Sequence, residues 1–526
     1  MIGRLPRHPV SEQHDGNDKP SVPVMAGSSA QPLKSGKQRA HPEPHHATSE
    51  ASSSSPDLLP FTKSQKGSSK LAGPFHLRLN QDAEIEHVGV NVVNFLETQS
   101  RHSKIRLLQR RSRILRCTMF LIFFAFLVAL LSIFQHRKES DLRTLWTPDP
   151  ETRLFEQRPL LPPLERNSIT NYSLPLRTSG RNIIDADGRR FKLASMNWYG
   201  ASDELFVPGG LAMLHRKEIA ESIKRMGFNS VRLPYADEML MRNPIPDQAH
   251  VLANPDLMGL TAMDVFEAVT TSLTDAGLAV IINDHITSAT WCCGANPCDA
   301  AWSNDYLGPV CKVKMSEEKW IQNWETMMSR FVSNPLVIGA DLRNEVRGLW
   351  GTMPWSSWAS AAERCGDRLL ALNPDWLIVV EGTSSANDLS GVRSRPVRLK
   401  VPHRLVYSAH VYAWSGWGSW AGRFKQQSYG TFRQAMKKNW GYLLEEDVAP
   451  VWVGEIGAPR RPTKGDANYW MNLWRYLKAV DADFGYWAIN PRKPTGSKES
   501  YSLVAEDWRT AIRDYRLKQM TDHIRA

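Results

Sequence analysis

Eight short apolar runs recur along the C-terminal part of this 526-residue chain, each bounded by polar or turn-forming residues. Parallel strands that are covered on both faces have this continuous apolar character. Eight such strands with interleaved helices over about 330 residues predict an α/β fold, a (β/α)8 TIM barrel. The runs cover residues 191–199, 229–235, 279–285, 337–345, 377–382, 405–412, 450–457 and 484–490; the helical segments cover 215–226, 262–276, 317–331, 358–372, 432–444 and 468–480.

A doubly wound open sheet is the alternative fold for this alternating pattern. Its dinucleotide-binding form would need a G-x-G-x-x-G turn after the first strand. The sequence has no such turn there. The barrel therefore remains the favoured prediction, with its catalytic domain at residues 176–520.

A second constraint is the uncharged stretch from Cys117 to Phe134, which predicts a transmembrane helix over residues 117–135 in contact with the lipid bilayer. Eighteen helical residues reach roughly 27 Å, close to the hydrocarbon thickness of a bilayer. The long preceding segment argues against a cleaved signal peptide. The N-terminal flank carries seven Lys and Arg residues, whereas the other flank mixes basic and acidic residues. The positive-inside bias predicts a single-pass type II signal anchor, with the catalytic domain in the lumen or outside the cell.

The segments on either side of this helix have the composition of spacers. Residues 1–116 are rich in Ser, Pro and basic residues and are expected to form a disordered cytoplasmic arm. Residues 136–175 contain several prolines and are expected to form an extended stem. The arm holds 17 Lys and Arg against 10 Asp and Glu, and the rest of the chain holds 48 against 44. This nearly balanced charge argues against a nucleic-acid partner.

Four cysteines lie within twenty residues, and two interpretations remain open for them. Cys292, Cys293, Cys298 and Cys311 would form disulfides in an oxidising compartment, with Cys365 as a fifth cysteine in the same domain. A zinc site is the alternative, although the spacing lacks paired C-x-x-C units. The pairing does not follow from the sequence. Asn171 begins a glycosylation sequon in the stem.

Polar residues at the ends of the predicted strands indicate where the chemistry lies, since reactive groups of such barrels gather at the C-terminal strand ends. Glu345 ends the fourth predicted strand and Glu455 the seventh. Glycosidic bond cleavage uses a pair of carboxyl groups, one to protonate the leaving oxygen and one to attack or stabilise the anomeric centre. The other strand-end residues are Arg232, His285, Asn344, His410, Tyr412 and Trp487.

These strand ends also carry motifs that resemble glycoside hydrolase family 5, the cellulase family. The resemblance covers residues 176–508, including an opening Ile184-Asp-Ala-Asp-Gly188 turn and a closing Asp507-Trp508 pair. The motifs appear in the family's order: Val231-Arg-Leu-Pro-Tyr235, Asn283-Asp-His285, Arg343-Asn-Glu345, His410-Val-Tyr412, Gly454-Glu-Ile-Gly457 and Gly485-Tyr-Trp487. Trp291-Cys-Cys293 resembles a cysteine-bearing loop of some members.

The resemblance implies a retaining glycosidase that acts on a β-linked polysaccharide or glycan, with an endo-β-glucanase or cellulase as the nearest type. By motif position Glu345 would be the general acid/base and Glu455 the nucleophile. Arg232 would keep Glu455 ionised, since a cationic neighbour lowers a carboxyl pKa. Asn344 would donate to the sugar 2-hydroxyl.

Four further residues receive supporting roles from the same motifs. His410 and Tyr412 would orient the glutamates, His285 would contact sugar hydroxyls, and Trp487 would form the stacking floor of the −1 subsite. The carboxyl groups of a retaining enzyme stand about 5 to 5.5 Å apart. Neither a cofactor nor a metal is expected.

Two rival functions remain. A Golgi-type glycosyltransferase shares the anchor-and-stem layout, and its Asp-x-Asp motif has matches at Asp185-Ala-Asp187 and Asp481-Ala-Asp483. Both matches also fit turns of the barrel. A non-catalytic carbohydrate-binding barrel is the second rival. Among other residues, Glu381 is interpreted as structural, Trp320 and Trp324 as helix-packing, and Trp414, Trp417 and Trp420 as either cleft-lining or loop-packing.

Overall fold

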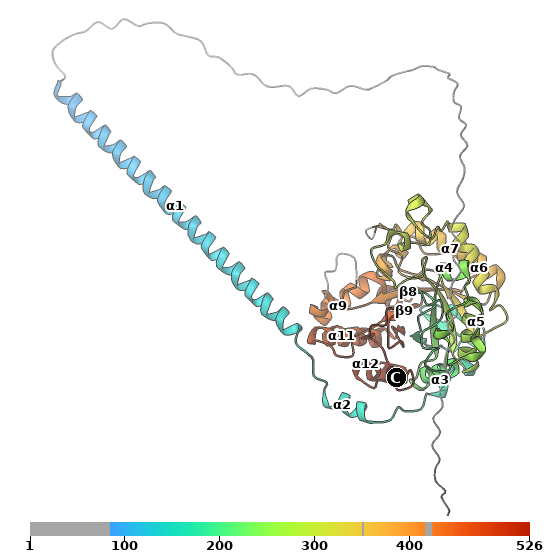
Figure 1. Ribbon diagram of the computed structural model, residues 1–526. Coiled ribbons are helices and arrows are strands. Elements are labelled where there is room, and N and C mark those ends of the chain that lie inside the picture. The colour runs from blue at the N-terminus through green and yellow to red at the C-terminus, as the bar shows by residue number, and fades with distance from the viewer. Residues whose placement is uncertain (1–84, 350–351, 416–422) are drawn as a thin grey trace, which may run out of the picture. The chain divides into compact units, whose positions relative to one another are not determined.

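The computed structural model describes residues 85–349, 352–415 and 423–526 (Figure 1). Eight parallel strands form a closed barrel in the order β10-β3-β4-β5-β6-β7-β8-β9. Closure through the β10–β3 pair excludes the open sheet and confirms the predicted TIM barrel. The strands are β3 (Ala194–Asn197), β4 (Ser230–Ala236), β5 (Ala279–Ile286), β6 (Val337–Asp341), β7 (Leu377–Glu381), β8 (Leu405–Val411), β9 (Val451–Ile456) and β10 (Asp483–Tyr486).

Helices lie around the outside of the strands, and each of the six segments predicted as helical contains helix (Figure 1). The segment 432–444 is not one regular helix, because a π-turn (Lys437–Gly441) separates α9 from α10. The helices of the catalytic domain are α3 (Arg216–Arg225), α4 (Asp237–Arg242), α5 (Ala262–Asp275), α6 (Glu317–Ser329), α7 (Trp355–Leu372), α8 (Thr383–Ala386), α9 (Tyr429–Met436), α10 (Tyr442–Glu445), α11 (Lys464–Val480) and α12 (Tyr515–Arg525). The predicted domain boundary at residue 520 falls inside α12.

Alternation along the strands decides which side chains enter the barrel. In β7, Leu377 and Val379 pack inside the barrel with Ile281 and Val406, whereas Ile378 and Val380 belong to the layer under the helices. The same two-residue period places Glu381 on the inner face at the end of β7. The same period in β5 and β8 turns His285 and His410 toward the barrel interior. The polar side chains at the strand ends therefore converge above the apolar side chains inside the barrel.

The N-terminal hairpin of β1 (Arg177–Ser179) and β2 (Asn182–Ile184) contributes to that floor. The turn that follows β2 explains the first Asp-x-Asp match. Asp185 is buried and pairs with Arg189, while Gly188 takes a positive φ of 86°. In the second match, Asp483 pairs with Arg190 at the start of β10. Both matches are therefore structural elements of the barrel.

Helix α1 (Ile85–Leu142) is continuous through the predicted anchor. It contains a span long and apolar enough to cross a membrane. The end of the predicted arm, from Ile85, is therefore helical rather than disordered; residues 90–142 contain neither Gly nor Pro to interrupt it. The arm up to residue 84, Trp417 and Trp420 lie outside the described residues.

The predicted stem is not extended throughout. Helix α2 (Pro150–Gln157) begins with a proline at its first position and is capped by Asp149, whose side chain accepts from the Thr152 N–H at 2.8 Å. The stem also contacts the catalytic domain, since Trp146 packs its ring against Tyr515 with centroids 5.3 Å apart. Asn167 donates to the Ile524 carbonyl at the end of α12.

Candidate active site

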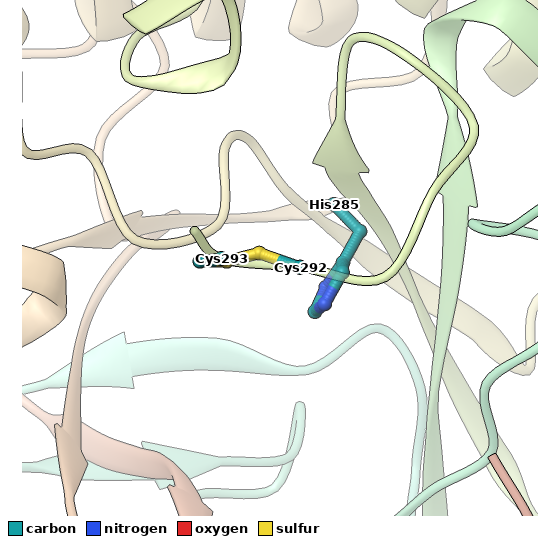
Figure 2. Close-up of side chains that lie close together, drawn as sticks. All are labelled: His285, Cys292 and Cys293. Atoms are coloured by element: carbon teal, nitrogen blue, oxygen red, sulfur yellow. A yellow bond between two sulfur atoms is a disulfide. The ribbon is translucent and has the colours of Figure 1, made fainter. Parts of the chain in front are cut away.

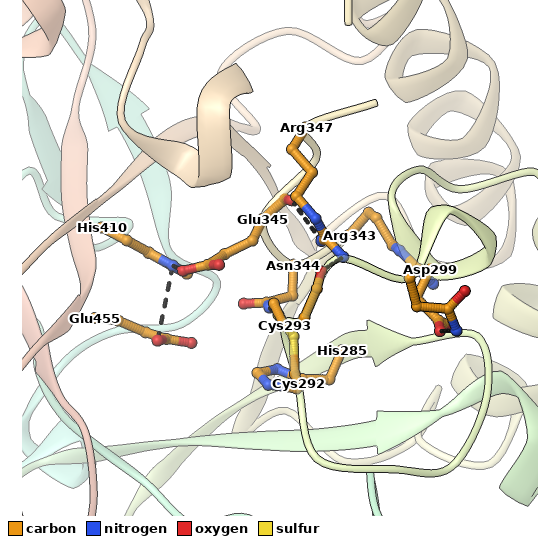
Figure 3. The surroundings of a disulfide bond; sticks show 12 residues. His285, Cys292, Cys293, Asp299, Arg343, Asn344, Glu345, Arg347, His410 and Glu455 are labelled. Atoms are coloured by element: carbon orange, nitrogen blue, oxygen red, sulfur yellow. Dashed lines mark hydrogen bonds and ion pairs between the residues drawn. A yellow bond between two sulfur atoms is a disulfide. The ribbon is translucent and has the colours of Figure 1, made fainter. Parts of the chain in front are cut away.

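Glu345 and Glu455 line the same cavity at the C-terminal ends of the strands, a space of about 340 Å³. One carboxyl oxygen of Glu345, one of Glu455 and a ring nitrogen of His410 all lie within 4.8 Å of one another. Figure 3 shows these three side chains facing a common space. The Glu455 side chain is 6% exposed, and the Glu345 side chain is 17% exposed. The two carboxyl groups predicted from the strand ends therefore do meet.

Arg232 is the centre of the buried charge network beneath Glu455. Its side chain is fully buried, and its Nη1 donates to Glu455 Oε1 at 2.5 Å. Its Nε donates to Asp341 Oδ2 at 2.7 Å, and its Nη2 donates to Glu381 Oε1 at 2.9 Å. The guanidinium thus holds Glu455 in place while two further carboxylates fix the orientation of the guanidinium.

His410 and Tyr412 hold the glutamates from β8 and its following residue. His410 Nδ1 lies 3.2 Å from Glu345 Oε1, and Nε2 lies 3.4 Å from Glu381 Oε1. The Tyr412 hydroxyl donates to Glu455 Oε2 at 2.8 Å. With Arg232 on Oε1, both oxygens of Glu455 therefore accept a hydrogen bond from a buried donor.

Burial and neighbouring charges act against each other in setting the ionisation of this network. Burial raises the pKa of Glu455 above its ordinary value, and the charges of His410 and Arg232 oppose but do not cancel that rise. The predicted lowering of this pKa by Arg232 is therefore outweighed. Burial also disfavours charge on His410, yet Glu381 and Glu455 raise its pKa well above the usual value. These two carboxylates therefore favour the positively charged form of His410.

Asn344 and Glu345 follow β6 in an irregular turn. Glu345 has a φ of +49°, a left-handed conformation that costs energy for a residue other than glycine. Its backbone N–H donates to Glu381 Oε2 at 2.7 Å, which holds the turn. The side-chain oxygen Oδ1 of Asn344 accepts a hydrogen bond from Arg232. The side-chain nitrogen Nδ2 therefore points to the other side, toward the sulfurs of Cys292 and Cys293.

Aromatic side chains form one wall of the cavity. The indole of Trp487 stacks against His285, with centroids 5.3 Å apart and planes 9° apart. Trp414 stacks on Tyr412 and also lines the cavity, which favours the cleft-lining interpretation for this residue. Trp320 and Trp324 are fully buried, which confirms that they pack helix α6. The cavity is lined by His285, Trp291, Cys292, Cys293, Asn344, Glu345, Tyr412, Trp414, Glu455, Trp487, Lys493, Glu499, Ser500 and Tyr501.

Comparison with models of known protein families identifies the family that has this arrangement. Residues 184–493 match the family model for cellulase, glycosyl hydrolase family 5, over more than half of the chain. The chain belongs to glycosyl hydrolase family 5. It is a glycosidase that hydrolyses O-glycosyl compounds, so the glycosyltransferase and the non-catalytic barrel are not supported.

Several endoglucanases are similar to this family 5 chain. An endoglucanase of Paenibacillus polymyxa is 31% identical over 351 residues, which cover 63% of this chain and 83% of the relative. The major extracellular endoglucanase of Xanthomonas campestris pv. campestris is 27% identical and is covered over 69% of its length. An endocellulase structure from Pyrococcus horikoshii covers 67% of this chain and 100% of its own, with a TM-score of 0.57 and 24% identity. This last likeness concerns the fold alone.

Two groups of described residues in the family 5 domain bring potential metal ligands within 4.8 Å of one another. The first is Glu345, His410 and Glu455. Both oxygens of Glu455 in this group already accept a hydrogen bond, from Arg232 at 2.5 Å and from the Tyr412 hydroxyl at 2.8 Å. The second is His285, Cys292 and Cys293, a set of soft donors that makes no ion pair within the described residues. In the structure the loop cysteines form two disulfides, Cys292–Cys293 and Cys298–Cys311.

The position of Glu381 in this network agrees with its interpretation as a structural residue. Glu381 is fully buried and does not line the cavity, yet it contacts Arg232, His410 and the backbone N–H of Glu345. His410 and Arg232 outweigh the effect of burial and lower its pKa to about 2. The inward two-residue period of Leu377 and Val379 is the sequence signal that identifies it. Glu381 therefore links Arg232, His410 and the Glu345 backbone, which predicts a positioning role.

We expect Glu381→Gln to destabilise the protein by about 3 kcal/mol or more, because removing one partner of a buried ion pair leaves the other charges uncompensated. Glutamine offers one acceptor oxygen, so it cannot serve Arg232, His410 and the Glu345 N–H together. Denaturant unfolding of the full chain in detergent measures the change. Glu446→Gln removes an exposed pair with Arg393 and is the matched control, for which little change is expected. Equal stability of the two variants would contradict the positioning role.

Proposed function

We propose that this protein is a retaining β-glucan hydrolase that works by double displacement, with Glu455 as nucleophile and Glu345 as general acid/base. The observation that carries the proposal is the approach of the two carboxyl groups to within 4.8 Å across the cavity. Retaining glycosidases hold their carboxyl groups about 5 to 5.5 Å apart, whereas inverting ones leave about 6.5 to 9.5 Å for a water molecule.

In the first step a carboxylate oxygen of Glu455 forms a bond to the anomeric carbon, and Glu345 gives its proton to the departing glycosidic oxygen. Arg232 and Tyr412 hold Glu455 from opposite oxygens, which keeps it oriented toward the sugar. The burial of Glu455 contributes as well, because a poorly solvated carboxylate is a stronger nucleophile. The side-chain oxygen of Asn344 is bound to Arg232, and its amide nitrogen, which lies against the sulfurs of Cys292 and Cys293, has a second N–H for the sugar 2-hydroxyl.

In the second step Glu345 takes a proton from water, and the water oxygen displaces Glu455 from the anomeric carbon. Both displacements invert the anomeric centre, so the product retains the β configuration. Trp487 and His285 supply the flat wall against which the sugar ring packs. The more exposed side chain of Glu345, at 17% against 6% for Glu455, suits the residue that exchanges its proton with water.

The substrate class rests on the relatives. Relatives from Paenibacillus polymyxa and Xanthomonas campestris pv. campestris carry endoglucanase names, and one solved structure holds an endocellulase of Pyrococcus horikoshii with cellotetraose. A cavity walled by indoles and lined by Asn, Glu, Lys and Ser side chains suits the apolar faces and the hydroxyl edges of β-linked glucose. We therefore assign a β-linked glucan as the substrate.

The test uses the full chain in detergent with soluble β-glucans. Proton NMR of the newly formed reducing ends distinguishes the anomers before they equilibrate. A β anomer formed first is expected, and an α anomer formed first would overturn the retaining mechanism. Failure to cleave any β-glucan, together with cleavage of another β-linked glycan, would overturn the substrate assignment alone.

The acid side of the pH profile tests the role of His410. Its imidazolium lowers the pKa of Glu455 against the effect of burial. In His410→Gln that positive charge is absent, so the pKa of Glu455 rises and the nucleophile becomes ionised only at higher pH. We expect the acid limb of kcat/KM to move to higher pH. His250→Gln, outside the cavity, is the control. An unmoved limb in His410→Gln would contradict this electrostatic role.

We also propose a single-pass type II topology, with residues 1–116 in the cytoplasm, 117–135 in the bilayer, the stem at 136–175 and the catalytic domain after it. Support comes from the apolar span in α1, the seven basic residues preceding it, the Cys298–Cys311 disulfide and the exposed sequon asparagine Asn171. The lumenal or extracellular side is the oxidising one, where disulfides persist.

Protease protection in sealed microsomes tests this topology. An N-terminal tag is expected to be digested while the catalytic domain survives. Removal of N-glycans is expected to increase the mobility of the parent chain but not that of Asn171→Gln. A protected tag with a digested catalytic domain would overturn the orientation.

A further inference from the structure

The Cys292–Cys293 pair faces the same cavity as the two glutamates. Both residues are part of the cavity lining and are partly exposed. The other disulfide of this loop, Cys298–Cys311, is buried and does not line the cavity. A small thiol that enters the cavity therefore reaches the sulfurs of Cys292 and Cys293 directly. Figure 2 shows this pair beside the imidazole of His285.

His285 completes a set of three soft ligands. A ring nitrogen of His285 and the sulfurs of Cys292 and Cys293 lie within 4.8 Å of one another. Two thiolates and an imidazole are the donors that zinc and other thiophilic divalent ions prefer. A disulfide provides no thiolate, so the set becomes a strong ligand group only after the Cys292–Cys293 bond is reduced.

The partners of His285 leave one ring nitrogen available as a ligand. His285 Nδ1 lies 2.9 Å from Asn283 Oδ1, and the Asn283 amide nitrogen donates to Asp341 Oδ2 at 3.1 Å. Because the Asn283 amide nitrogen faces Asp341, the Asn283 side-chain oxygen faces His285 and accepts a hydrogen bond from it. His285 Nδ1 therefore carries the proton, and Nε2 carries the lone pair. No hydrogen bond involves Nε2 within the described ranges. Metal-binding histidines commonly have this arrangement, with the second ring N–H donated to an amide or carbonyl oxygen.

We propose that, after reduction by a low-molecular-weight thiol, Cys292, Cys293 and His285 bind one thiophilic divalent cation such as Zn²⁺, and that the bound cation blocks the sugar site. In the reduction, two reductant thiols give two electrons and two protons, the Cys292–Cys293 bond breaks, and a reductant disulfide forms. Metal binding then releases the two protons of the cysteine thiols. Three protein ligands leave a fourth position for water.

The proposed inhibition follows from the position of the three metal ligands beside the sugar site. His285 stacks on Trp487, and the Asn344 amide nitrogen lies 3.2 Å from Cys293 Sγ. A cation at the sulfurs with its bound water therefore occupies space beside the groups to which we assign sugar binding. The inhibitory half of the proposal rests on the proposed β-glucan hydrolase function of this site, whereas the binding half does not.

The test uses the full chain in detergent, reduced with dithiothreitol, freed of it by anaerobic gel filtration, and titrated with Co²⁺ or Zn²⁺. We expect one ion per reduced chain at this site, a thiolate-to-cobalt charge-transfer band, and X-ray absorption of bound zinc showing two sulfur ligands and a nitrogen. The oxidised chain is expected to give no such band. A cobalt spectrum without sulfur ligation in the reduced chain, or the same band in the oxidised chain, would overturn the binding site.

Variants separate this pair from the other cysteines. Cys292→Ser/Cys293→Ser is expected to lose the band, and Cys298→Ser/Cys311→Ser is expected to keep it. The X-ray absorption measurement needs no variant and decides the case if a double variant fails to fold. Zn²⁺ is expected to lower β-glucan turnover of the reduced chain at least about 10-fold, with recovery on chelation. Bound zinc with unchanged turnover would overturn the proposed inhibition and leave the binding site intact. A chain that binds cobalt through sulfur but never cleaves β-glucan would point to failure of the proposed function instead.

Discussion

Glu455→Gln is expected to lower kcat on β-glucans by about 10⁴-fold or more, in the range observed when an enzyme loses its covalent nucleophile. The amide cannot form the glycosyl-enzyme bond, although it still accepts a hydrogen bond from Arg232. KM is expected to change little, since the aromatic wall and Asn344 remain. Steady-state kinetics of the full chain measures both quantities.

The control for this loss is Glu446→Gln, which makes the same chemical change at an exposed ion pair with Arg393. Denaturant unfolding of Glu455→Gln shows whether the variant is folded. A folded Glu455→Gln protein that retains more than about a tenth of the parental kcat would remove Glu455 from the nucleophile's role, because loss of a covalent nucleophile has far larger effects.

The sequence predicts most of the barrel and the strand-end residues for a simple physical reason. Parallel strands covered on both faces must be apolar, so a polar residue at a strand end is there for a purpose other than packing. His410 and Glu455 stand near such ends, whereas Arg232 lies inside β4, and the structure brings the three together within hydrogen-bonding or ion-pair distance. The inward period of Leu377 and Val379 in β7 also places Glu381 in the network, in agreement with its interpretation as a structural residue.

Other properties depend on tertiary environment and do not follow from sequence pattern. The upward shift in the pKa of Glu455 depends on how deeply the carboxyl is buried, which the motif does not contain. The pairing of the loop cysteines depends on the path of the loop after β5. The prolines of the stem predict an extended conformation. Pro150 instead starts helix α2, because the first helical position needs no N–H donor.

Glu345→Gln is expected to have an effect that depends on the leaving group. In a β-glucan the leaving group is a sugar alkoxide, which departs only when its oxygen is protonated. Loss of the general acid is therefore expected to lower kcat by about 10² to 10⁴-fold. A nitrophenyl β-glycoside loses a stable phenolate and needs little protonation. For that substrate the first displacement by Glu455 continues, while the second is slow because no base activates the water.

The result is a pre-steady-state burst of nitrophenol in Glu345→Gln, with an amplitude of about one equivalent per active chain, followed by slow turnover. Glu455→Gln cannot form the intermediate and is expected to give no burst. Stopped-flow absorbance of the two variants therefore assigns each carboxyl group to its step. A burst in Glu455→Gln and none in Glu345→Gln would exchange the two roles. Absence of a burst in both, with equal losses on glucans and nitrophenyl glycosides, would contradict double displacement, because only a covalent intermediate separates the release of the two products.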